Sequence, residues 1–189
     1  VSNRGDKRAL GLTALGIATC RPVPSRASAQ VGDTVYVTGT LGDALAGFEL
    51  IDAGFDEVGA LADAFNRPQA RLSEGQKLAP HVHAMMDISD GLLIDAERMA
   101  TASRLGIEID LARIPLSPSY VSYRTDSLES RMQAASWGDD YELLFCAPAD
   151  ARIAIDATAV GRVIAGGGLT LCNGDEPVKL PPTLGYQHH

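Results

Sequence analysis

Two aspartates and a serine stand together where an apolar strand is expected to turn into a helix. Asp87, Ser89 and Asp90 lie within the segment Met85–Leu93, whose first residues are typical of a strand. Both carboxylates could converge on one divalent cation, and carboxylate oxygens are ligands that Mg²⁺ prefers. The N–H groups at the start of the helix could hold a phosphate beside that ion. The same residues also fit an ordinary helix N-cap, provided by Ser89 or Asp90.

A second acidic segment follows Trp137 and carries Asp139, Asp140 and Glu142 around a glycine turn, just before an apolar run. Its carboxylates could face a metal ion or a cationic substrate, with Trp137 or Tyr141 available to stack on a ring. The alternative is a solvated acidic turn. The pattern therefore indicates either a binding site or a plain loop.

Three weaker patterns could also bind ligands. Residues 38–43 contain two glycines after an expected strand, and their N–H groups could cradle a phosphate or simply form a turn, since the P-loop lysine is missing. His81 and His83 should point the same way, as a metal pair or as two edge histidines. Arg26 is a lone cation near the expected sheet, either functional or solvated.

The composition limits the classes of function. The 189 residues are 46% hydrophobic, so the chain can bury a core. Sixteen Lys and Arg against 24 Asp and Glu give a net charge of −8, which disfavours nucleic acid and anionic membranes as partners. No apolar run approaches the roughly 20 residues of a membrane helix, and no signal peptide is expected. Three widely spaced cysteines indicate reduced thiols, typical of the cytoplasm.

The elements that would position these residues follow from the pattern of apolar residues, β-branched residues and glycines. Strands are expected over residues 34–38, 83–88, 107–111, 141–146, 159–164 and 169–172. Helices are expected over residues 44–53, 56–65, 70–78 and 92–105. Glycines 54 and 106 should end two of these helices. Residues 115–136 are polar and receive no assignment.

The two kinds of element mix without a strict βαβ rhythm, which favours an α+β fold with helices covering a mixed sheet. Residues 9–16 read as an isolated strand, and residues 21–25, with two prolines, as a linker.

Taken in order, these segments resemble the thiamine-monophosphate kinases of the aminoimidazole-ribonucleotide synthetase superfamily. The resemblance is carried by Val35–Asp43, Met86–Leu92 and Gly138–Phe145, and it extends over nearly the whole chain. Shorter matches are Asn66–Pro68, Ile114–Ser117, Val160–Val163 and the terminal residues 185–188. Trp137 departs from the family pattern, which has a glycine there.

The resemblance implies ATP-dependent phosphorylation of thiamine monophosphate to thiamine diphosphate with Mg²⁺, in the cytoplasm. It implies that Asp87 and Asp90 bind magnesium and that Ser89 and Arg26 contact ATP. It also implies that Asp139 meets the thiamine phosphate and that Tyr186 lies against it; no general base is assigned. These last two roles complete the implied site.

The resemblance further implies that residues 1–25 end an N-terminal domain and that residues 26–189 form the C-terminal ATP-binding-type domain. The family's N-terminal half supplies further magnesium carboxylates and builds a homodimer. We therefore expect this chain alone to bind nucleotide weakly and to turn over little. Two alternatives remain: another ATP-dependent phosphotransferase or ligase of the superfamily, and an inactive binding or dimerisation module.

Overall fold

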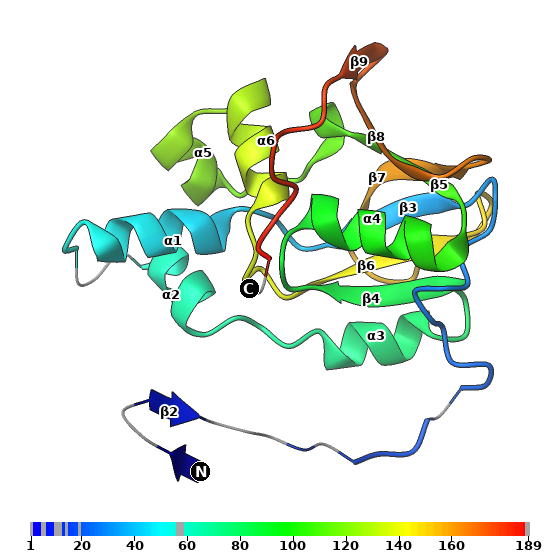
Figure 1. Cartoon of the computed structure of the whole chain (residues 1–189), viewed down its shortest axis with the longest axis horizontal. Helices are drawn as coiled ribbons and strands as arrows, with labels where there is room; N and C mark the ends of the chain where they lie inside the picture. Colours follow the sequence, from blue (N-terminus) through cyan, green and yellow to red (C-terminus); the bar gives the residue numbers. More distant parts are fainter. Residues whose placement is uncertain are drawn as a thin grey trace.

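A seven-stranded mixed sheet organises the chain (Figure 1), and its strand order is β4-β6-β3-β7-β5-β8-β9. The computed structural model describes residues 2–4, 7–9, 13, 15–18, 20–55 and 59–187. Neighbouring strands are antiparallel except β5 and β8, which are parallel. The strands are β3 (Thr34–Thr38), β4 (Ala84–Ile88), β5 (Gly106–Asp110), β6 (Glu142–Ala147), β7 (Ala157–Ile164), β8 (Gly168–Asn173) and β9 (Glu176–Val178).

The first residues contain a separate two-stranded antiparallel sheet of β1 (Ser2–Arg4) and β2 (Lys7–Ala9). Half of the strand predicted over residues 9–16, at residues 10–12 and 14, lies outside the described residues; Ala9 ends β2, and residues 13, 15 and 16 form neither helix nor strand. Residues 21–25 form neither helix nor strand, as their prolines predicted.

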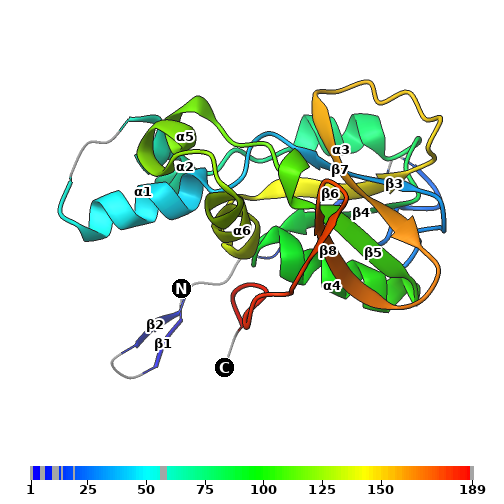
Figure 2. The ribbon, with the colours of Figure 1, turned by 90° about the horizontal axis from the view of Figure 1, so that it is seen from above.

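Helices cover both faces of the large sheet. Figure 2 shows α4 (Leu92–Ser103) on one side and α3 (Leu72–Leu78) on the other. The remaining helices gather beside one end of the sheet; they are α1 (Asp43–Asp52), α2 (Ala60–Asn66), α5 (Pro118–Arg124) and α6 (Leu128–Ser136). A short 3₁₀ helix, η1 (Leu111–Arg113), follows β5. The predicted α+β fold with a helix-covered mixed sheet is confirmed.

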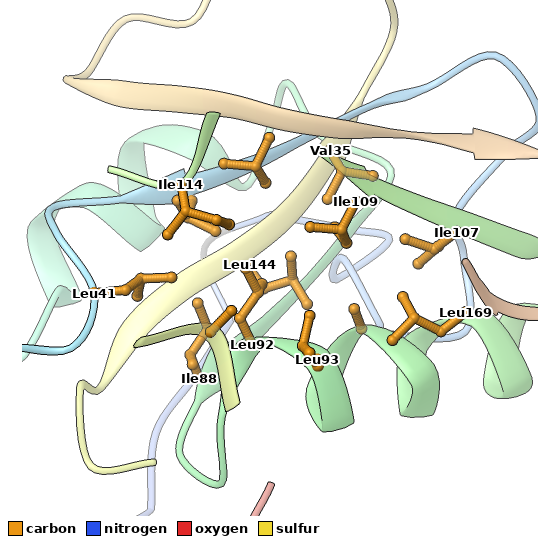
Figure 3. Packing of buried hydrophobic residues seen from close by; sticks show 14 of the residues in the cluster. Val35, Leu41, Ile88, Leu92, Leu93, Ile107, Ile109, Ile114, Leu144 and Leu169 are labelled. Carbon is orange, nitrogen blue, oxygen red and sulfur yellow. The ribbon is translucent and has the colours of Figure 1, made fainter. Parts of the chain in front are cut away.

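The main core lies between the sheet and α4 because strand residues alternate between the two faces. Figure 3 shows Ile88, Leu92 and Leu144 among its side chains, all without solvent exposure. On the opposite face, Tyr36 stacks on Phe145 with ring centroids 5.2 Å apart. Among the described residues no helix is both long enough and apolar enough to cross a membrane.

Two sequence predictions were wrong or incomplete. Residues 115–136 contain two helices, and each begins at a serine whose hydroxyl accepts an N–H: Ser117 from Tyr120 and Ser127 from Ser130. Polar caps and few apolar residues hid these helices from a periodicity argument. Gly106 does not end α4; Arg104 takes the left-handed conformation at φ 57°, and Gly106 begins β5.

Candidate functional site

Three segments far apart in the sequence meet through their backbones where β4 turns into α4. The N–H of Asp139 donates to the carbonyl of Ser89, and the N–H of Tyr186 donates to that of Asp90, both at 2.9 Å. They surround a cavity of about 690 Å³. It is lined by Ser89, Asp90, Ser136, Trp137, Gly138, Asp139, Tyr141, Thr183, Gly185 and Tyr186. Four of the six predicted site residues therefore share one cavity: Ser89, Asp90, Asp139 and Tyr186.

Glycines permit this close meeting of backbones. A Cβ at Gly138 would lie 2.5 Å from the carbonyl oxygen of Ser89. A Cβ at Gly185 would lie 2.4 Å from that of Asp90. Since real Cβ contacts are never this short, no larger residue fits without moving the Ser89–Asp90 turn.

The Ser89–Asp90 turn is held by α4 itself. The N–H groups of Ser89 and Asp90 both donate to one carboxylate oxygen of Asp95, at 3.1 Å each. The other oxygen of Asp95 accepts Nη1 of Arg98 at 2.7 Å, and the same Nη1 donates to Asp90 at 2.5 Å. Burial raises the pKa of Asp95, whereas Arg98 and the two N–H groups act in the opposite direction.

This arrangement overturns the N-cap interpretation of the turn. The N-cap of α4 is Gly91, and no side chain caps it. Sequence reasoning missed Asp95 and Arg98, although their i, i+3 spacing places them on one helix face.

Asp87 does not share the cavity of Asp90. Successive strand residues face opposite sides of a sheet, so Asp87 points away from the side on which Ile88 is buried. It lines a second cavity of about 550 Å³, walled mostly by apolar residues of α3 and of the linker, such as Val23 and Leu72. Contrary to the prediction from the sequence, the structure therefore does not bring Asp87 and Asp90 together around one ion.

Tyr141 stands in the wall of both cavities. Its backbone is left-handed, with φ 50°, and its N–H donates to the carbonyl of Ile88 at 2.9 Å. Burial first, and then the charges of Asp139, Asp87 and Asp90, raise the pKa of its hydroxyl. The phenol stays protonated beside three carboxylates and forms a hydrogen bond with Asp139.

The three acidic residues of the second segment, Asp139, Asp140 and Glu142, have different surroundings. Asp139 lines the cavity. Asp140 accepts the N–H of Gly42 at 3.1 and 3.2 Å, at the start of α1, and burial raises the pKa of its carboxyl well above the usual value. Glu142 forms an ion pair with Arg71 at 2.5 Å. Only Asp139 is thus placed to meet a ligand of this cavity.

The glycine-containing loop at residues 38–43 is a turn that fixes α1. The N–H of Gly42 already donates to the carboxylate of Asp140, and that of Leu41 donates to the carbonyl of Pro115, so neither is left for a phosphate. Asp43 accepts hydrogen bonds from Thr40 at 2.9 Å and Ser117 at 2.5 Å. The plain turn, one of the two predicted alternatives, is what the structure shows.

Arg26 lies at the far end of α4 from Ser89. Its carbonyl accepts the hydroxyl of Ser103, the last residue of this 12-residue helix, at 3.0 Å. Twelve residues of α-helix span about 18 Å. The structure therefore does not bring Arg26 and Ser89 into one cavity of this chain.

The two histidines do not form a metal pair with a third ligand. His83 Nδ1 lies 2.9 Å from Asp33 Oδ1, whereas His81 is exposed. Across the described part of the chain, no three His, Cys, Asp or Glu side chains are grouped so that they could hold a metal ion.

An aromatic cluster backs the cavity. Trp137, the only tryptophan, stacks on Phe48 of α1 with ring centroids 5.4 Å apart. Phe65 of α2 packs on the Phe48 ring, with centroids 5.5 Å apart. Trp137 Nε1 is buried without a hydrogen-bond partner. The indole thus joins the helices at the end of the sheet to the cavity wall.

Fold and site together define a helix-covered α+β domain with an acidic cavity at a strand-to-helix turn. The chain belongs to the family described as AIR synthase related protein, C-terminal domain, which it matches over residues 30–172. The thiamine-monophosphate kinase of Caulobacter vibrioides is 31% identical over 194 residues, which cover 93% of this chain and 53% of that protein.

Solved structures agree with this family. That of thiamine-monophosphate kinase from Stenotrophomonas maltophilia matches with a TM-score of 0.72 and 32% identity, over 78% of this chain and 52% of that one. The structure described as AaThiL complexed with AMPPCP and TMP matches with a TM-score of 0.72 and 34% identity, over 82% of this chain and 53% of that one. The chain spans about half the length of the curated relatives it matches.

Proposed function

We propose that this chain carries part of the site of a kinase that transfers a phosphoryl group from ATP to thiamine monophosphate and yields thiamine diphosphate. The observation that carries the proposal is the cavity in which Ser89, Asp90, Asp139 and Tyr186 converge. The similarity to thiamine-monophosphate kinases supports it, as does the complex of AaThiL with AMPPCP, an ATP analogue, and TMP.

The substrate's chemistry fits the residues of the cavity. Thiamine monophosphate has a fixed positive charge on its thiazolium ring, and a carboxylate and an aromatic ring both attract such a cation. Asp139 would supply the charge, and Tyr186, which is largely exposed at the cavity rim, would supply the ring. Both residues are held by backbone hydrogen bonds to the Ser89–Asp90 turn, so the substrate would lie beside that turn.

ATP would be contacted by Ser89 and by Arg26. Because Ser89 lies in the cavity and Arg26 lies at the other end of α4, the two residues would touch different parts of the nucleotide or different ATP molecules of a homodimer. Phosphoryl transfer depends mainly on positioning and charge neutralisation. The attacking phosphate oxygen is already ionised, so the chain needs no strong general base.

The donor set fits Mg²⁺. Asp87 and Asp90 line different cavities, so they would hold separate ions, and each ion would be completed by water and substrate phosphates, since Mg²⁺ commonly takes one or two carboxylates. When bound, the ion neutralises charge on the transferred group. The acidic balance of the chain also agrees with a cytoplasmic protein that binds cations rather than nucleic acid.

The assay incubates the whole protein with ATP, Mg²⁺ and thiamine monophosphate and detects thiamine diphosphate chromatographically. Asp139→Asn should lower kcat/KM at least ~10-fold, because it removes the charge facing the thiazolium. Asp150→Asn, at an exposed turn after β6, is the matched control. If the whole protein forms no thiamine diphosphate, the proposed function is overturned. Equal activity of Asp139→Asn and the wild type would overturn the role of Asp139.

The 189-residue chain is assayed in parallel, alone and with the N-terminal half of a thiamine-monophosphate kinase relative added in trans. We expect little turnover alone, and a small thermal shift with ATP and Mg²⁺. Full activity of the lone chain would contradict this part of the proposal.

A further inference from the structure

A closed set of charged hydrogen bonds connects α4 to the acidic turn that precedes it. Asp95 is completely buried and receives the N–H groups of Ser89 and Asp90 on one oxygen. Its second oxygen receives Arg98, whose Nη1 also reaches the Asp90 carboxylate. The backbone of the turn and the side chain of Asp90 are therefore fixed by the same two helix residues.

The two residues act differently on Asp90. Asp95 holds the backbone and lies too deep to meet a ligand in the cavity. The side chain of Arg98 is about one third exposed, with a relative exposure of 35%, and its charge lies directly against the carboxylate of Asp90. A cation at this distance neutralises much of the charge that Asp90 presents to the cavity.

We propose that Asp95 and Arg98 are positioning residues for Asp90, and that Arg98 competes with a divalent cation for its carboxylate. The proposal rests on the assignment of Asp90 to Mg²⁺ in the proposed function. Arg98 keeps the Asp90 carboxylate oriented and lowers the affinity of this carboxylate for the ion. Asp95 also accepts a hydrogen bond from the Arg98 guanidinium and so limits this competition.

The two positions therefore predict changes of opposite sign. Arg98→Met removes the competing charge but keeps the apolar stem, so cation binding should tighten ~3–10-fold, while turnover of the whole protein falls ~10-fold or more because Asp90 loses its orientation. Asp95→Asn keeps an acceptor for the N–H groups but releases Arg98 to Asp90 alone, so cation binding should weaken ~3-fold. A purely structural role would weaken binding in both variants.

The measurement is a titration of the 189-residue chain with Mn²⁺, a paramagnetic substitute for Mg²⁺, in which electron paramagnetic resonance counts the free ion. Asp90→Asn is the reference without the ligand. Arg162→Met is the matched control, because Arg162 forms an ion pair with Glu108 at 2.7 Å on strands β7 and β5, away from the cavity. Circular dichroism checks that each variant folds, and Arg98→Gln and Arg98→Lys replace Arg98→Met if it does not. Glutamine should tighten binding, and lysine, which keeps the charge, should not.

Three results would overturn the inference. They are unchanged or weaker Mn²⁺ binding in Arg98→Met or Arg98→Gln, equal binding in Asp90→Asn and the wild type, and no Mn²⁺ binding by the wild-type chain. None of them decides whether the whole protein phosphorylates thiamine monophosphate, which the chromatographic assay measures separately.

Discussion

Glu142 and Arg71 form a bidentate ion pair that ties β6 to the start of α3. Arg71 Nε and Nη2 donate to the two carboxylate oxygens of Glu142 at 2.7 and 2.5 Å, and the hydroxyl of Thr38 donates to one of them at 2.5 Å. Glu142 is buried, and its hydrogen bonds raise the pKa of Arg71. Replacing Glu142 by Gln should lower the free energy of unfolding by about 3 kcal/mol, because the part-buried guanidinium loses its bidentate charge partner and keeps only the longer ion pair with Glu74, at 3.6 Å.

Urea unfolding of Glu142→Gln, Arg71→Met and the double variant measures the coupling between the two residues. The control is the same cycle at Glu108 and Arg162, where the arginine is 67% exposed and the coupling should stay below about 1 kcal/mol. Equal coupling energies in the two cycles would show that burial does not strengthen the first pair.

Gly138 allows the second acidic segment to touch the Ser89–Asp90 turn. Gly138→Ala should destabilise the fold by about 2 kcal/mol, since its Cβ would lie 2.5 Å from the Ser89 carbonyl oxygen. Gly167→Ala is the matched control, because nothing lies within 4 Å of a Cβ there, and it should change stability by less than ~0.5 kcal/mol. Thermal unfolding of both variants compares them; equal midpoints would refute the close contact.

Trp137 provides a direct signal from the cavity because it is the only tryptophan and lines the wall. Thiamine monophosphate should change its fluorescence on binding. Tyr186→Ala should weaken the affinity measured this way ~10-fold, which corresponds to about 1.4 kcal/mol of lost ring contact. Tyr123→Ala, an exposed tyrosine on α5, should leave the affinity unchanged. An unchanged affinity in Tyr186→Ala would remove this tyrosine from the substrate site.

Asp140 should make the fold less stable as the pH rises. Burial raises its pKa well above the ordinary value of 3.8, so between these two pKa values the folded chain binds more protons than the unfolded chain. The stability that this group contributes is complete below pH 3.8 and is lost as the pH rises through the folded-state pKa. Asp140→Asn should flatten this decrease, as measured by urea unfolding across the pH range.

Asp126 provides the control of opposite sign. Its hydrogen bond with Arg131 lowers the pKa of the Asp126 carboxyl. The stability that this group contributes is therefore present above pH 3.8 and is lost as the pH falls through the folded-state pKa. Asp126→Asn should therefore leave the loss of stability at rising pH in place. If Asp140→Asn and Asp126→Asn gave the same pH dependence as the wild type, neither assignment would hold.

Local patterns predicted much of the fold. β-Branched and apolar runs located six of the seven strands of the large sheet, and Gly54, at φ 87°, follows the end of α1 as predicted. The helices of residues 115–136 and the short strand β9 were missed because they have too few apolar residues to show a period. Their stability comes from packing and caps rather than from a repeating pattern.

The site was predictable only in part, and Asp87 and Asp90 show the reason. Their types and their three-residue spacing predicted one shared cation site, but Asp87 near the end of β4 and Asp90 in the turn line different cavities. Asp139, Asp140 and Glu142 are also close in sequence, but Asp139 lines the cavity, Asp140 binds the N–H of Gly42, and Glu142 forms an ion pair with Arg71. Asp139 and Asp140 lie in the turn before β6 begins at Glu142, and the positive φ angles of Asp139 and Tyr141 in this turn change the direction of the chain from one residue to the next.

The sequence by itself determined the α+β class, the order of most elements, the family resemblance and the residues with ligand chemistry, since these depend on composition, local period and motif. Only the tertiary structure decided which residues share a cavity: it joined Tyr186 and Asp139 to the Ser89–Asp90 turn, left Arg26 at the far end of α4, and placed Asp95 and Arg98 behind Asp90. The physical reason is that these contacts join segments up to almost 100 residues apart, and their geometry depends on sheet register and close backbone packing.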